Sequence, residues 1–234
     1  MTNYFKLPTW ADNDHVYAVV ETPRGSRAKL EFDPKLGAFT LAKPLLAGLT
    51  YPYDWGFIPS TKAEDGDPLD VLIIHDAATY PGLVLTCKPI GVLEVVQSSK
   101  GKKERNDRVF VVPDRSPFEG DLQDIRRLPS RAIKELEKFF EATNALEPKT
   151  LQFLGWRGPA KAIRTITRRC RSEPEWTGEN GMVRPCGLAF RAAELDIRRS
   201  CASPRDAARY SVPLCQRRIP TPPSFREPNV LSAV

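Results

Sequence analysis

Four acidic residues within seven positions form the group of side chains most suited to chemistry in this 234-residue chain. The segment is Glu64-Asp65-Gly66-Asp67-Pro68-Leu69-Asp70, and it leads directly into the apolar residues 71–74. Carboxylates crowded at the start of a buried strand repel one another, which raises their pKa values, unless a cation or a set of donors compensates. We therefore expect this segment to bind a metal ion.

The donors of this segment are hard oxygen atoms, and His75 is the nearest nitrogen ligand. Such donors favour Mg²⁺ or Mn²⁺ over zinc or copper. A calcium loop is excluded, because the fifth and sixth positions counted from Asp65 are Leu69 and Asp70 instead of a ligand and a glycine. We expect His75 to be a structural side chain at a strand end. An acidic turn with solvated carboxylates is the alternative interpretation.

The aspartate segment and several motifs around it resemble the signature of the family I soluble inorganic pyrophosphatases. The similarity covers about residues 14–167, and its most specific part is Asp65-Gly66-Asp67-Pro68-Leu69-Asp70-Val71. The other matching segments, in order along the chain, are Glu21-Thr22-Pro23, Lys29-Leu30-Glu31-Phe32, Tyr51-Pro52, Gly56-Phe57-Ile58-Pro59, Gly91-Val92-Leu93, Val112-Pro113 and Phe139-Phe140-Glu141.

This resemblance implies a mainly β fold with flanking helices, built on a five-stranded OB-type β-barrel. It implies hydrolysis of pyrophosphate to two phosphates with Mg²⁺, or with Mn²⁺ in its place, and a homo-oligomer. Asp67 would be the catalytic base for the attacking water. The implied metal ligands are Asp65, Asp67, Asp70, Glu21 and Glu31. The implied phosphate-binding residues are Lys29, Lys43, Tyr51 and Arg108.

Three departures from the family pattern fall at groups that the resemblance would place at the site. Trp55 stands where a tyrosine is usual, and Thr143-Asn144 replace a Tyr-Lys pair. In the third segment, Gln97 and the run Asn106-Asp107-Arg108 stand where the family has two aspartates and a lysine. Because the intervening loop is longer than expected, Glu104 and Asp107 are candidate carboxylates without an assigned role.

Two other classes of function stay open. One is a catalytically degenerate family member that keeps the fold and a metal site. The other is an OB-fold protein that binds phosphate or nucleic acid, since a barrel of this type hosts such sites and fold does not fix function. Nucleic acid is the less favoured ligand, because three clustered carboxylates repel a phosphate backbone.

The elements that must position these residues are short strands separated by Pro and Gly. We expect strands at residues 16–21, 28–33, 38–41, 70–74, 83–96 and 108–112. Ser130 is expected to cap a helix, and Pro159 to begin a second one that ends near Arg169. The inward face of the first helix is expected to consist of Ile133, Leu136, Phe139 and Phe140, acting as core side chains.

The chain divides by composition into a barrel domain at residues 1–167 and a tail at residues 168–234. The tail holds 12 Arg, no Lys and seven acidic residues, so it carries +5 of the net charge of +6. It shows little periodicity, and we expect it to be disordered. Its composition suggests a frameshifted or extended reading frame, or alternatively an arginine-rich arm. The five cysteines are expected to be free thiols.

The beginning of the chain shows no charged-then-apolar signal segment, and no apolar run approaches 18 residues. These features predict a cytoplasmic protein without a membrane span.

Overall fold

The computed structural model describes residues 3–99, 101–117 and 120–171. The sequence-based interpretations of the tail therefore lie outside the described residues, apart from its first four positions. The described residues form nine strands, two α-helices and two short 3-10 helices at Tyr4–Lys6 and Ile125–Arg127.

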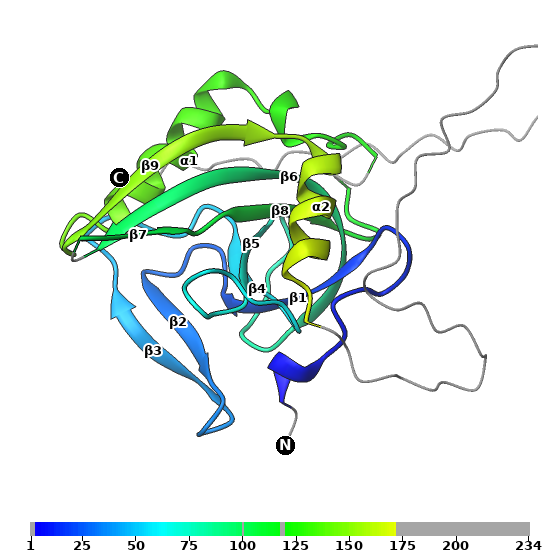
Figure 1. Cartoon of the computed structure of the whole chain (residues 1–234), viewed down its shortest axis with the longest axis horizontal. Helices are drawn as coiled ribbons and strands as arrows, with labels where there is room; N and C mark the ends of the chain where they lie inside the picture. Colours follow the sequence, from blue (N-terminus) through cyan, green and yellow to red (C-terminus); the bar gives the residue numbers. More distant parts are fainter. Residues whose placement is uncertain (1–2, 100, 118–119, 172–234) are drawn as a thin grey trace, which may run out of the picture. The chain divides into compact units, whose positions relative to one another are not determined.

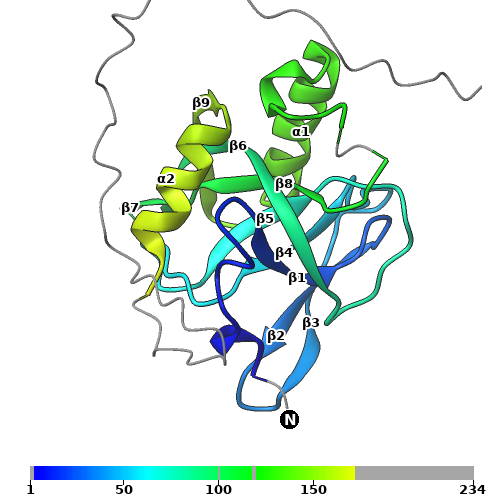
Figure 2. The same ribbon diagram turned by 90° about the vertical axis from the view of Figure 1, so that its right-hand side faces the viewer.

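Five strands close into a ring (Figures 1 and 2). The ring runs through β1 (Val16–Thr22), β4 (Asp54–Ile58), β5 (Leu69–Ile73), β8 (Arg108–Pro113) and β6 (Val84–Ser99), and β6 pairs again with β1. Neighbouring strands are antiparallel except β5 and β8, which are parallel. The expected five-stranded OB-type barrel is thus confirmed.

The 16-residue β6 is long enough to pair with several strands along its length. Beyond the ring it pairs with β7 (Lys102–Arg105) and β9 (Lys149–Arg157). At Gly91 the register of β6 against β8 shifts, and a Cβ there would lie 2.1 Å from Ile125 Cγ2. The missing side chain therefore lets the 3-10 helix at Ile125–Arg127 pack directly on the strand.

A separate hairpin is formed by β2 (Ala28–Asp33) and β3 (Ala38–Pro44), which extends to one side of the barrel in Figure 1. All six expected strands are present, with β3 and β6 longer than expected. Three strands were not expected: β4, β7 and β9. β4 has a central glycine, and the exposed, polar positions of β9 hide its pairing with β6.

Side chains of the barrel strands divide between two hydrophobic clusters, because successive residues of a strand point to opposite faces. Val109 and Val111 of β8 share a cluster with Ile166 of α2, whereas Phe110 and Val112 share one with α1. Every residue of β8 is buried. The ring is therefore covered by a helix on both sides of this strand.

The two helices are α1 (Ser130–Thr143) and α2 (Pro159–Arg169). The expectation that Ser130 caps α1 is wrong: the cap position is Pro129, and no side chain makes a capping hydrogen bond, since Ser130 already belongs to the first turn. Leu136, Phe139 and Phe140 are buried as expected, and Ile133 is half-buried. Among the described residues, no helix is both long and apolar enough to span a membrane.

Candidate active site

A cavity of about 280 Å³ collects most of the side chains that the sequence singles out. Its walls come from the β2–β3 hairpin, the ring strands, the end of α1 and the start of β9. The lining residues are Lys29, Glu31, Tyr51, Trp55, Asp65, Asp67, Asp70, Gln97, Asn106, Arg108, Phe139, Phe140, Thr143, Asn144 and Lys149.

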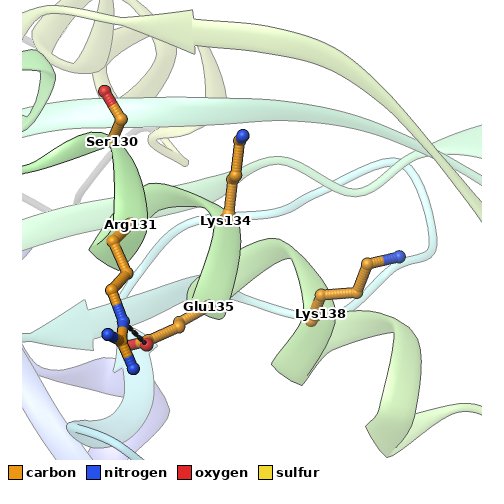
Figure 3. Close-up of a pocket in the computed structure, with 5 residues that line it drawn as sticks. All are labelled: Ser130, Arg131, Lys134, Glu135 and Lys138. Carbon is orange, nitrogen blue, oxygen red and sulfur yellow. Dashed lines mark hydrogen bonds and ion pairs between the residues drawn. The ribbon is translucent and has the colours of Figure 1, made fainter.

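A larger hollow of about 420 Å³ lies elsewhere, along the first three turns of α1 (Figure 3). Its five lining residues include the exposed ion pair Arg131–Glu135, with Nε and Oε1 2.8 Å apart. Figure 3 shows Lys134 and Lys138 pointing away from this pair. The hollow is made of solvated side chains on one helix face, so we place the site in the smaller cavity.

The aspartate segment presents its carboxylates from a turn and a strand. Asp70 belongs to β5 and pairs with Phe57 of β4, while Asp65 and Asp67 lie in the preceding turn. Gly66 adopts φ +99°, which favours glycine, and the Asp67 N–H donates to Asp65 Oδ1 at 3.2 Å. Glu64 lies outside the cavity lining and binds Arg169 Nη2 at 2.5 Å.

Arg108 is the cation that contacts Asp70. Its Nη1 lies 2.5 Å from Asp70 Oδ2, and its guanidinium carbon lies 5.0 Å from the ring centroid of Trp55 and 5.4 Å from that of Phe140. Trp55 thus takes up the place of the usual tyrosine as a flat surface against which the guanidinium stacks. Among the described groups, Arg108 Nε and Trp55 Nε1 are buried without a hydrogen-bond partner.

Two carboxylates of the segment, those of Asp65 and Asp70, have raised pKa values and resist ionisation. Burial raises the pKa of Asp70, against the opposing effect of Arg108 and Lys29. Burial also raises the pKa of Asp65, and the charges of Asp70, Asp67 and Glu104 add to this effect. A bound cation would relieve this repulsion, so the residues fit a divalent metal ion.

The β2 strand brings a lysine and a carboxylate to the same cavity. Lys29 Nζ lies 2.5 Å from Glu31 Oε1. Burial lowers the pKa of Lys29, but the charges of Asp70 and Glu31 outweigh it and the net pKa is raised, so the ammonium stays charged. Tyr51 is buried, which raises the pKa of its phenol and keeps it a proton donor.

Two of the expected site residues are not part of the lining. Glu21 is buried behind it, where its Oε1 accepts the Phe32 N–H at 2.9 Å and burial raises its pKa to about 7. Lys43 lies opposite Lys29 in the hairpin, but its Nζ donates to the Thr143 carbonyl at 2.9 Å and pairs with Glu147. Both residues therefore support the cavity from outside its surface.

The third segment contributes amides instead of carboxylates. Gln97 and Asn106 line the cavity, and Asn106 Oδ1 accepts a hydrogen bond from Arg108 Nη1 at 2.8 Å. Asp107 is outside the lining and accepts the Val95 N–H at 3.0 Å. Glu104 pairs with Lys102 and lies close enough to Asp65 to affect its pKa.

His75 has the structural role expected of it. It is buried, and its Nε2 lies 2.7 Å from Asp54 Oδ2. Sequence reasoning did not identify Lys149 as a site residue, because it lies in a strand that was not expected and beyond the motifs of the resemblance.

One further group of potential ligands lies before β1. Among the described residues, Asp12, Asp14 and His15 alone place three ligand atoms within 4.8 Å of one another. His15 Nδ1 is already bound by both acids, at 2.9 and 3.2 Å. The group has no connection to the cavity lining, and nothing else there indicates a ligand.

Comparisons with known proteins agree with this geometry. A family model described as inorganic pyrophosphatase matches residues 18–173. Two enzymes named inorganic pyrophosphatase, from Synechocystis sp. and Geobacillus stearothermophilus, are 34% and 36% identical to the chain. These matches cover 70% and 66% of this chain, and 95% and 92% of the two relatives.

Two solved structures of inorganic pyrophosphatases are also similar to this chain. The crystal structure of inorganic pyrophosphatase from Thermus thermophilus matches with a TM-score of 0.66 and 36% identity, over 72% of this chain and 97% of that one. The structure from Neisseria gonorrhoeae matches with a TM-score of 0.63 and 31% identity, over 71% and 96%.

Proposed function

The chain belongs to the inorganic pyrophosphatase family, and we propose that it hydrolyses pyrophosphate to two phosphates at the cavity, with Mg²⁺ held by the aspartate segment. The observation that supports this site most directly is the convergence of Asp65, Asp67 and Asp70 with Lys29 and Arg108 on one cavity. Carboxylates for metal ions and cations for phosphate are the groups that phosphoryl transfer to water requires.

The metal ligands we assign are Asp65, Asp67 and Asp70, with Glu31 beside them and Glu21 behind. Bound Mg²⁺ would neutralise phosphate charge and lower the pKa of a coordinated water. The oxygen donors fit Mg²⁺, with Mn²⁺ as the alternative.

The other roles in the reaction, proton transfer and phosphate binding, are assigned to side chains of the cavity. Asp67 is exposed and, among the described residues, no donor binds its carboxylate, so it is available to accept a proton from the attacking water. Lys29 and Arg108 bind phosphate oxygens through charged N–H donors, and the Tyr51 phenol supplies a neutral one. Lys43 acts indirectly, because it holds the end of α1 beside the cavity.

The alternatives of a nucleic-acid binder and a degenerate family member are not favoured by the matching relatives, which carry the name of the active enzyme. A homo-oligomer and a cytoplasmic location are further proposals that rest on family membership. Light scattering of the full chain would test the first.

The function is tested by phosphate release from pyrophosphate, triphosphate and ATP with the full chain, in Mg²⁺ and after addition of a chelator. We expect turnover of pyrophosphate that requires the metal. Turnover of nucleotide without turnover of pyrophosphate would overturn the proposal.

A further inference from the structure

The end of α1 forms part of the cavity wall but supplies no charge to it. The Thr143 hydroxyl donates to the Phe140 carbonyl at 2.9 Å, and the Asn144 amide donates to the same carbonyl at 3.0 Å. Both side chains are thereby used to complete the last turn of the helix. Their donors are therefore directed toward the helix backbone, away from a ligand in the cavity.

This helix end is also electrostatically unfavourable for an anion, since unpaired carbonyls give the C-terminus of a helix a partial negative charge. Lys43 compensates one of these carbonyls, because its Nζ donates to Thr143 O at 2.9 Å. Lys43 is thus held at the helix and lies outside the cavity lining.

Among the described lining residues, Lys149 is the one cation besides Lys29 and Arg108. It is the first residue of β9, and its backbone is fixed by pairing with Ser99 of β6. Its Nζ lies 3.0 Å from Glu147 Oε2, and its side chain is 38% exposed. The backbone of Lys149 is therefore held in place, while its partly exposed side chain can change rotamer.

Glu147 is shared by Lys149 and Lys43, one on each carboxylate oxygen. Burial raises the pKa of Glu147, but hydrogen bonds from Lys43 and Lys149 outweigh it and the net pKa is lowered, so the carboxylate is ionised. Two ammonium groups and one carboxylate leave a net charge of +1 at this part of the wall. A phosphate anion can accept a hydrogen bond from the Lys149 ammonium while Glu147 keeps Lys43 as its partner.

We propose that Lys149 is a substrate-binding residue: it turns from Glu147 to the pyrophosphate anion and supplies the positive charge that Thr143 and Asn144 do not. This inference rests on the proposed function, since it assigns one more contact to the same substrate. In it, Glu147 acts as a positioning residue that keeps the ammonium at the cavity edge when substrate is absent.

The test compares wild type with Lys149→Met and Lys149→Arg, using the full chain. Binding of imidodiphosphate, a pyrophosphate analogue with a nitrogen bridge, is measured by calorimetry at two salt concentrations with Mg²⁺, together with kcat and KM for pyrophosphate. Loss of one charge-assisted contact should weaken binding of the analogue by roughly tenfold and raise KM similarly in Lys149→Met. Lys149→Arg should recover most of the affinity, and the salt dependence should be smaller in the Met variant.

Lys134→Met is the matched control, because Lys134 is exposed on α1 and outside this cavity. Circular dichroism confirms folding of each variant. Equal affinity and equal salt dependence in wild type and Lys149→Met would overturn the inference while leaving the proposed function intact. If wild type binds the analogue through Lys149 but releases no phosphate, the inference stands and the proposed function fails. Absence of analogue binding in wild type would overturn both.

Discussion

The cavity lining has an acidic part and an amide part, and they differ in what they retain. The acidic part, made of Glu31, Asp65, Asp67 and Asp70, has four of the five carboxylates that the family resemblance implies as metal ligands, and the fifth, Glu21, is buried behind it. The amide part, made of Gln97, Asn106 and Asn144, has neutral groups where that resemblance implies charged ones. The two parts come from different elements: β2, β5 and the turn before β5 for the first, and β6, the approach to β8 and the end of α1 for the second. The two parts of the lining can therefore change separately in this fold.

The largest expected effect comes from the acidic part. Asp67→Asn should lower kcat for pyrophosphate by about 10²–10⁴-fold, since it removes the proposed proton acceptor. Steady-state phosphate release measures it, with Asp76→Asn in the exposed loop after β5 as the matched control. A variant that kept more than about a tenth of the wild-type kcat would remove Asp67 from this role.

The second prediction concerns Glu21, the buried carboxylate behind the acidic part, when no metal is bound. Burial raises the pKa of Glu21 from 4.5 to about 7, so between these values the folded state holds a proton that the unfolded state has lost. Protonated Glu21 therefore makes its full contribution to folding stability below the unfolded pKa, and this contribution is lost as pH rises through about 7. The cost at higher pH is on the order of 3 kcal/mol.

Glu21→Gln should abolish this contribution. We expect the difference in free energy of unfolding between wild type and variant, measured by urea titration without divalent ions, to shift by that amount from pH 4.5 to pH 8. Glu135→Gln, on the exposed face of α1, serves as the control. A difference that stays constant across this range would show that Glu21 is ionised in the folded state at all these pH values.

A third prediction lies at the boundary between the two parts, where Arg108 binds both Asp70 and Asn106. Arg108→Met should raise KM for pyrophosphate by about 10–100-fold, since a charge-assisted contact is lost. The KM of Arg108→Lys should lie between those of wild type and Arg108→Met, because lysine keeps the charge but loses the stacking on Trp55. Arg131→Met is the control. An unchanged KM would mean that Arg108 only neutralises Asp70.

The smallest effect is expected from returning a charge to the amide part. Asn106→Asp should lower the Mg²⁺ concentration for half-maximal activity by about two- to fivefold, as one more partly exposed carboxylate joins the site. Calorimetric titration with Mg²⁺ gives a reading that does not depend on turnover. Asn3→Asp is the control, because Asn3 is exposed and an aspartate keeps its capping hydrogen bond with the Phe5 N–H. If the affinity for Mg²⁺ did not change, the side chain at position 106 would lie too far from the ion to affect its binding.

The acidic part could be predicted from the sequence. The amide part could be predicted only as a set of positions where the sequence departs from the family pattern. Asp65, Asp67 and Asp70 are within six residues, so a local motif is sufficient to identify them. The partner of Asp70 is Arg108, 38 positions away, and only the parallel pairing of β5 with β8 brings them together. The role of Lys149 depends in turn on β9, whose alternating exposure gave too weak a signal.

The closed barrel was predicted through the family resemblance, whereas the residue pattern alone indicated only separate strands. Contact between β1 and β6 depends on the length of β6, and no residue within either strand encodes it alone. The cap at Ser130 failed because Pro129 fixes the start of α1 through its backbone, without a side-chain oxygen.

The three aspartates also differ in how long each keeps its place. Asp70 is part of a strand hydrogen-bonded on both sides within a closed ring, so its backbone amide is expected to exchange with deuterated solvent only when the ring opens. Asp65 and Asp67 lie in an exposed turn outside the ladder, where exchange needs only local opening. One proposed ligand is thus held by a strand of the ring, whereas the other two belong to a turn that can open without it.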